Sequence, residues 1–268
     1  MVVRMIWCAL MACVIAVGLH ATEEVIVVEQ QYKILKIGEG GVDAKDIKQK
    51  LYIHKDWVRI DDFSDATSAQ PTETFFIDFK EKKIYDADNL GPKMTVVTFD
   101  ERREKIEQNI KDVQRDLKNM DEGPQKKKFL RLNKALLDLD RKFETKEMPD
   151  KSKVSGVDCK VIEIVDSSEN EYVPYKASLH PDIILPSDYA DALFLLKILG
   201  KGMKEYLSKQ KDLFQHLPME LTLDLAAGGK LETKVVKVER KRLDQLDAGL
   251  DQPPAIKMPP TPDPKKGK

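Results

Sequence analysis

The feature that most constrains the fold is the alternation of apolar and polar residues in short segments separated by turns. The segment TFFIDF is the clearest example, because its large apolar side chains project to one side and Asp78 projects to the other; these apolar residues are Phe75, Ile77 and Phe79. This period of two indicates a half-buried antiparallel strand. Similar segments recur roughly every eight to twelve residues between Glu24 and Asp100, which predicts a meander or an open barrel.

A different pattern begins at Asp100. Apolar residues are now spaced alternately three and four apart, as on one face of a helix in coiled-coil register. They form two runs: Ile106, Ile110, Val113, Leu117 and Met120, then Phe129, Leu132, Leu136, Leu139 and Phe143. Gly123 and Pro124 separate the runs and favour the end of the first helix. We therefore predict an antiparallel helical hairpin inserted over residues 100–147, in which Leu130 and Leu137 need further cover from the sheet or from a partner.

The strand pattern resumes after Lys153. A long helix is predicted over residues 187–214 with Ser187 as its N-cap, and Gly200 and Gly202 within it indicate close packing or a bend. Alternation in HLPMELTLDL, followed by the glycines of AAGGK, then predicts a β-hairpin. The predicted fold class is α+β, with a curved antiparallel half-barrel sheet covered by the long helix and interrupted by the inserted helical hairpin.

The N-terminus has the pattern of a signal peptide. Arg4 precedes an apolar run, residues 5–19, whose length suits a signal-peptide core and is short for a membrane span. We expect cleavage after Ala21, while an uncleaved anchor and a lipoprotein attached through Cys13 remain alternatives. The protein is therefore expected to be exported, to the periplasm or the cell envelope.

The rest of the chain reads as one domain with a tail. Residues 1–21 are the predicted signal peptide, 22–250 a single half-barrel domain, and 251–268 a disordered tail rich in proline and lysine. The 45 Lys and Arg residues nearly balance the 46 Asp and Glu residues, and this lack of a basic excess argues against nucleic acid as a partner.

The titratable residues do not form a recognisable catalytic or metal-binding pattern. Cys159 is the only cysteine after the leader, so it cannot form an internal disulfide, and its place in a strand predicts packing as a small hydrophobe rather than redox chemistry. His54, His180 and His216 lack the spacing of metal ligands. We therefore predict no catalytic residues, no cofactor and no metal, and expect that the protein is not an enzyme.

A curved sheet covered by a helix can enclose apolar volume, and such places commonly hold small apolar ligands. The residues expected to line this volume are Trp57, Phe75, Ile77, Phe79, Leu193, Leu196, Leu221 and Leu223. The alternative is that these side chains simply pack on one another and fill the core.

Several segments together resemble a known family. They are the meander strands KLYIHKDWVRIDDF and TFFIDFKEKKIYDAD, the strand SGVDCKVIEIV and the C-terminal hairpin LPMELTLDLAAGGKLETKVVKVER. Over residues 25–99 and 154–245 the chain resembles the periplasmic lipoprotein-carrier (LolA/LolB-like) superfamily, and in particular a secreted branch with a Gly-x-x-Cys strand, whose places Gly156 and Cys159 hold.

The resemblance implies an open half-barrel capped by helices, which in some members holds a lipid or an acylated protein. We therefore expect an exported binding protein whose partner is a lipid or acyl chain. The alternative is an envelope scaffold that docks a protein partner with the 100–147 hairpin, while its basic tail contacts an anionic surface. Under either hypothesis, excision of residues 101–146 is expected to spare folding.

Overall fold

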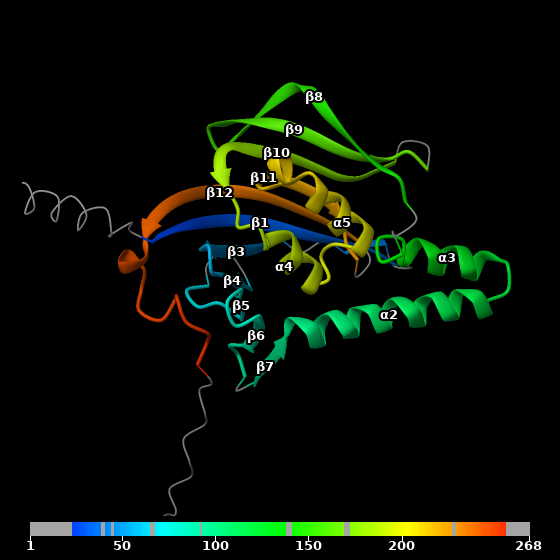
Figure 1. The fold of residues 1–268 in the computed structure, drawn as a ribbon, viewed down its shortest axis with the longest axis horizontal. Coiled ribbons are helices and arrows are strands. Elements are labelled where there is room, and N and C mark those ends of the chain that lie inside the picture. Colours follow the sequence, from blue (N-terminus) through cyan, green and yellow to red (C-terminus); the bar gives the residue numbers. More distant parts are fainter. Residues whose placement is uncertain are drawn as a thin grey trace, which may run out of the picture.

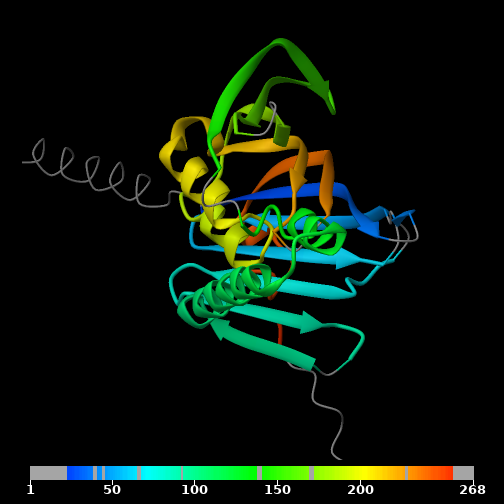
Figure 2. The ribbon, with the colours of Figure 1, turned by 90° about the vertical axis from the view of Figure 1, so that its right-hand side faces the viewer.

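The computed structural model describes residues 23–38, 41–43, 46–64, 68–91, 93–137, 141–168, 172–226 and 229–255. In this part of the chain one antiparallel sheet has the strand order β7-β6-β5-β4-β3-β1-β12-β11-β10-β9-β8, and β2 pairs with the end of β1. The strands are β1 Glu24–Gly38, β2 Gly41–Asp43, β3 Asp46–Ile53, β4 Trp57–Phe63, β5 Glu73–Asp78, β6 Lys83–Asp88, β7 Lys93–Thr98, β8 Phe143–Val154, β9 Val157–Asp166, β10 Tyr172–Ile184, β11 His216–Asp224 and β12 Lys230–Arg242. Figures 1 and 2 show an open, curved sheet with the helices gathered on one face.

The hairpin turns follow the local sequence. The β8–β9 turn consists of Ser155 and Gly156, whose φ angles are 49° and 85°. Two consecutive residues with positive φ form the turn that best matches the twist of antiparallel strands, and glycine adopts this conformation without strain. Short turns also join β3 to β4 and β5 to β6.

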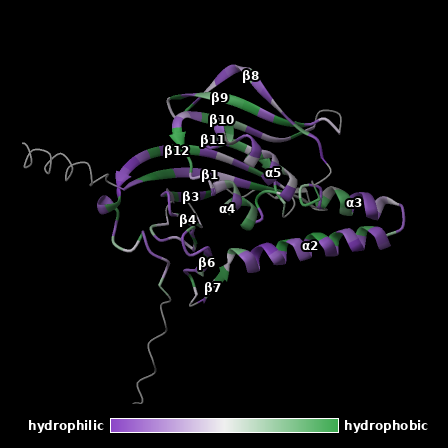
Figure 3. Cartoon of the chain, in the orientation of Figure 1, coloured by the Kyte–Doolittle hydropathy of each residue, from purple (hydrophilic) through white to green (hydrophobic). Residues whose placement is uncertain are grey.

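Helices α2 (Phe99–Asn119) and α3 (Pro124–Leu132) lie antiparallel to each other (Figure 1). Thr98 begins α2 with a capping box, because its side chain accepts a hydrogen bond from Glu101 N while the Glu101 carboxylate accepts one from Thr98 N. Figure 3 shows hydrophilic and hydrophobic residues alternating along α2. Three of the hydrophobic residues, Ile106, Ile110 and Val113, pack in the core of the domain.

The predicted bounds of the helical hairpin, 100–147, are too long. The second helix ends at Leu132, and residues 143–147 belong to strand β8. Of the second apolar row, Leu137 packs against the core, whereas Leu130 is 43% exposed. Leu139, which was expected in the first row of the second helix, falls outside the described residues.

The single long helix predicted over residues 187–214 is also wrong. The segment forms three short helices, α4 (Tyr189–Leu195), α5 (Lys201–Lys209) and α6 (Lys211–Phe214). The break has two local causes: Lys197 has a φ of 61°, outside the helical region, and Gly200 is extended as the residue before α5.

The two faces of the sheet have separate cores. The larger core lies between the concave face and the helices. The smaller one lies on the opposite face and consists of Val25, Val27, Tyr52, Trp57 and Phe76. Leu243, Leu246 and Leu250, from the segment that begins with the short helix η2 (Leu243–Gln245), pack over it. The C-terminal segment up to Leu250 is therefore part of the folded domain.

None of the helices in the described part of the chain is long and apolar enough to span a bilayer. The predicted signal peptide lies outside the described residues, as do residues 256–268 of the predicted tail.

Candidate apolar binding site

A small pocket lies between strands β10 and β11 and the helices α4, α5 and α6. Its volume is about 60 Å³, and its wall is mostly aliphatic and aromatic. Ser187, Ser208 and Gln215 contribute polar groups to the lining. The apolar lining residues include Tyr175, Leu185, Tyr189, Leu193, Leu199, Leu207, Phe214, Leu221 and Leu223.

The structure brings only some of the predicted lining residues to this pocket. Leu193, Leu221 and Leu223 line it, and Leu196 packs nearby in the same concave core without lining it. The predicted set came from strand alternation and helical spacing, and it missed Tyr175 of β10, Tyr189 of α4 and Phe214 of α6, which also line the pocket.

The remaining predicted residues lie elsewhere. Phe75, Ile77 and Phe79 belong to the concave core at the other end of the sheet, where Phe79 packs edge to face on Phe99 at 6.4 Å. The expectation that Trp57 faces inward is wrong. Strand β4 places Val58 in the concave core, so its neighbour Trp57 faces the opposite side, where its ring stacks on Phe76 at 5.6 Å.

The aromatic wall of the pocket is uncharged. Burial raises the pKa of the Tyr189 hydroxyl to about 12 and also raises the pKa of the Tyr175 hydroxyl. The Tyr175 ring packs edge to face on Phe214, with 5.7 Å between the ring centroids. Both tyrosines therefore stay neutral at physiological pH, and the pocket suits an apolar rather than an ionic occupant.

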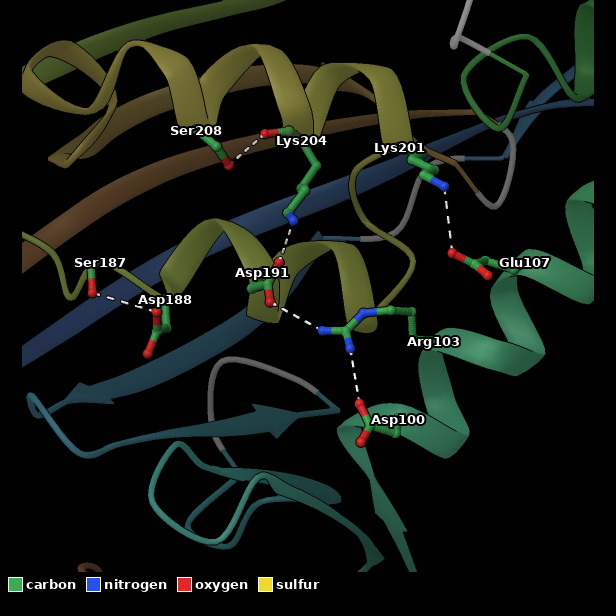
Figure 4. Close-up of polar contacts among 9 residues, drawn as sticks. All are labelled: Asp100, Arg103, Glu107, Ser187, Asp188, Asp191, Lys201, Lys204 and Ser208. Carbon is green, nitrogen blue, oxygen red and sulfur yellow. Dashed lines mark hydrogen bonds and ion pairs between the residues drawn. The ribbon is translucent and has the colours of Figure 1, made fainter.

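Charged residues tie the helices that cover the pocket to α2 (Figure 4). Asp191 on α4 forms ion pairs with Arg103 on α2, at 3.4 Å, and with Lys204 on α5, at 2.7 Å. Lys201 on α5 pairs with Glu107 on α2 at 3.4 Å. These contacts link α4 and α5 to α2, which is far from them in the sequence.

A further hydrogen bond supports the same arrangement. Arg102 Nε on α2 donates to the carbonyl oxygen of Leu195, the last residue of α4, at 2.8 Å. A cation at this position also interacts favourably with the negative end of the helix dipole. Side chains of α2 thus contact α4 at two places, the backbone carbonyl of Leu195 at its end and the carboxylate of Asp191 in its first turn.

The pocket as it stands is closed to any sizeable ligand. A volume of about 60 Å³ is room for only a few water molecules. Pockets that bury a drug-sized ligand typically enclose about 300–1,000 Å³. An acyl chain could enter only if α4, α5 and α6 moved away from strands β10 and β11.

On strands β4, β5 and β6 the concave face carries a row of acidic residues. Asp62 lies opposite Glu73, and Glu73 lies opposite Asp88. Asp62 accepts hydrogen bonds from Tyr32 Oη at 3.0 Å and Gln49 Nε2 at 2.7 Å. Burial raises the pKa of the Asp62 carboxyl despite these bonds, and burial together with neighbouring carboxylates raises the pKa of the Glu73 carboxyl.

Cys159 is a packed side chain rather than a reactive one. It is fully buried in the concave core, and its Sγ lies 3.5 Å from the Val157 carbonyl oxygen. Burial raises the pKa of the thiol, so the reactive thiolate is disfavoured at neutral pH. This agrees with the prediction that the thiol packs as a small hydrophobe.

A scan against protein-family models and a search of curated proteins find no match. A search of solved structures returns matches of low identity and low TM-score. The chain is 6% identical to a LolA superfamily protein from Nitrosomonas europaea, with a TM-score of 0.29 and coverage of 82% of this chain and 86% of that one. For a DUF1329 family protein from Desulfovibrio piger the identity is 8%, the TM-score 0.31 and the coverage 85% and 90%.

PNGF-II also matches, at 14% identity and a TM-score of 0.32, but the chain spans only 29% of its length. One of these matches is a protein of the LolA superfamily, the family that the sequence resembles. With TM-scores near 0.3, no ligand, residue role or compartment passes from these proteins to this chain.

Proposed function

We propose that this protein is an exported, non-enzymatic binding protein that holds a lipid or another apolar ligand between its sheet and the helices α4, α5 and α6. The observation that supports the proposal is the uncharged, mostly apolar pocket between β10, β11 and these helices. Its cover consists of short helices joined by irregular segments and held partly by ion pairs, so the cover can move without unfolding the sheet.

Ligand capture is tested first by mass spectrometry of organic extracts from the natively purified protein, in which we expect a co-purifying lipid. Binding is then measured by titration with a fluorescent fatty acid. We expect Leu193→Glu to weaken binding by roughly tenfold or more, because a carboxylate in an apolar pocket carries a desolvation cost of more than about 1.4 kcal/mol.

A matched control is Leu90→Glu, because Leu90 is 82% exposed at the turn after β6. This variant should bind the probe as the wild type does. Thermal unfolding checks that both variants are folded. Empty preparations together with probe binding that Leu193→Glu leaves unchanged would overturn the proposal.

The export part of the proposal is supported by the sequence of the leader. It is tested by the mass of the protein recovered from the envelope fraction of cells that express the full chain. We expect a chain that begins at Thr22. A chain retained in the cytoplasm with residues 1–21 attached would contradict export.

The scaffold alternative is not favoured. It needs the helical hairpin to offer an apolar seam to a partner, but Ile106, Ile110 and Val113 of α2 are buried against the protein's own core. The proposed contact of the basic tail with an anionic surface falls mainly on residues 256–268, outside the described residues.

A further inference from the structure

His54 lies in the turn between β3 and β4 and has one ring nitrogen without a partner. The residue is only 3% exposed. Its Nδ1 accepts a hydrogen bond from Asp56 N at 3.3 Å, whereas its Nε2 has no hydrogen-bond partner. A buried polar atom left unsatisfied costs about 1–3 kcal/mol, so a partner for this nitrogen would stabilise the folded protein.

Two carboxylates lie around the ring. Glu23 Oε2 is 4.0 Å from His54 Nε2, and Asp56 Oδ2 is 3.8 Å from His54 Nδ1. One donor atom from each of the three residues lies within 4.8 Å of the other two. The pairing of β1 with β3, in which Ile26 is opposite Ile53, brings Glu23 to the turn that contains the other two residues.

Positive charge already gathers at these carboxylates. Lys80 Nζ lies 2.9 Å from Asp56, and Lys55 Nζ lies 3.5 Å from Glu23 and 3.9 Å from Asp56. Both lysine side chains are exposed, at 70% and 68%. They can therefore swing into solvent at small cost, and neither is a hydrogen-bond partner of His54 Nε2.

We propose that Glu23, His54 and Asp56 form a binding site for a divalent transition metal ion, with Zn²⁺ as its expected occupant. Imidazole and carboxylate are both ordinary ligands of Zn²⁺, and water completes the coordination. His54 binds the ion through Nε2. Metal binding through Nε2 puts the ring proton on Nδ1, so Nδ1 must give up the hydrogen bond that it accepts from Asp56 N.

The site would need only local adjustment. The donor atoms must draw together from separations of up to 4.8 Å, because both carboxylates bind at about 2.0–2.2 Å from the ion. The Glu23 side chain is 46% exposed and free to make this movement. The ion then links the residue before β1 to the β3–β4 turn, independently of the proposed apolar pocket on the other face of the sheet.

The test is a titration of the whole protein, purified without a histidine tag, with ZnCl₂ in a calorimeter. A parallel titration with Co²⁺ uses its visible absorption and the fluorescence of Trp57, whose ring centroid lies 5.4 Å from that of His54. We expect one ion per chain. Glu23→Gln and His54→Gln should each weaken binding by roughly tenfold or more, as losses in a metal site commonly do.

Lys55→Ala should strengthen binding, because it removes a cation that competes for both carboxylates. Glu24→Gln is the matched control: Glu24 is the next residue, and its carboxylate pairs with Arg240 at 3.1 Å. His180→Gln tests a site elsewhere on the chain. Both controls should bind as the wild type does.

Three results would each overturn the proposal. They are the absence of saturable binding by the wild type, an affinity that Glu23→Gln leaves unchanged, and loss of binding in His180→Gln. If the His54→Gln variant does not fold, the affinity of the Glu23→Gln variant decides the outcome, because Glu23 is exposed and lies outside both cores.

Discussion

The burial of Glu73 and the carboxylates around it destabilise its negative charge. The residue lies between Asp62 and Asp88 on neighbouring strands, and like charges directly opposite each other in a sheet are destabilising. Burial is the largest cause of its raised pKa, followed by the neighbouring carboxylates Asp86, Asp62 and Asp88. Folding therefore disfavours the charged form of the Glu73 carboxyl.

This preference predicts a pH-dependent gain in stability for Glu73→Gln. A carboxyl whose pKa is raised on folding contributes its full stability below its ordinary value of 4.5 and loses it as the pH rises through the folded value. At pH 7 the variant should be more stable by about 0.5 kcal/mol, roughly 1–2 °C in Tm. At pH 3.5 the two proteins should unfold at the same temperature.

The measurement is thermal unfolding followed by circular dichroism at both pH values. Glu81→Gln serves as the control, because Glu81 is exposed in the turn between β5 and β6 and its replacement should leave Tm unchanged at either pH. A variant that is less stable than the wild type at pH 7 would show that the ionised carboxylate has a stabilising partner.

At the scale of elements, the helices over the pocket are the part of the domain most suited to movement. Each is short, and helices of this length are marginal on their own, so packing and the ties to α2 hold them in place. Regions with these properties open at lower free energy than the core strands.

Asp191→Ala should loosen this cover while leaving the sheet intact. The change removes the ion pairs with Arg103 and Lys204, each worth roughly 0.2–1 kcal/mol at partly exposed positions. We expect faster hydrogen exchange in α4 and α5 and greater uptake of a fluorescent apolar dye. Asp212→Ala, at an exposed position on α6, is the control, and equal dye uptake in the two variants would contradict the role given to Asp191.

At the scale of the whole molecule, the helical hairpin connects the two edge strands of the sheet. It leaves β7 at one edge of the sheet and returns at β8, the other edge. With strands about 4.8 Å apart, ten steps across the sheet amount to roughly 48 Å along its surface. The expectation that residues 101–146 can be replaced by a short linker therefore conflicts with the topology.

We predict that replacing residues 101–146 with five glycine and serine residues prevents the native sheet from forming. Such a linker reaches only about 18 Å and also removes the buried side chains of α2 from the core. Far-ultraviolet circular dichroism and thermal unfolding measure the result. A linker of about twenty residues, which can reach across the sheet, should recover more strand signal, whereas cooperative wild-type unfolding with the short linker would refute the prediction.

The sequence by itself determined most of the strands and the presence of a helical insertion, because these depend on local periodicity, but it assigned residues 143–147 of β8 to the insertion. It also identified Leu193, Leu221 and Leu223 as residues on apolar faces. It could not show which face of β4 lies inward: alternation separates Trp57 from Val58 but does not say which of them meets the helices.

Only the tertiary structure decided those features that depend on contacts between distant segments. The packing of α4, α5 and α6 on the strands closes the pocket to about 60 Å³. Strand pairing brings Glu23 to His54, and the C-terminal segment covers Trp57. Local patterns set the period and direction of each element, whereas the face that becomes buried is set by whatever the rest of the chain packs against it.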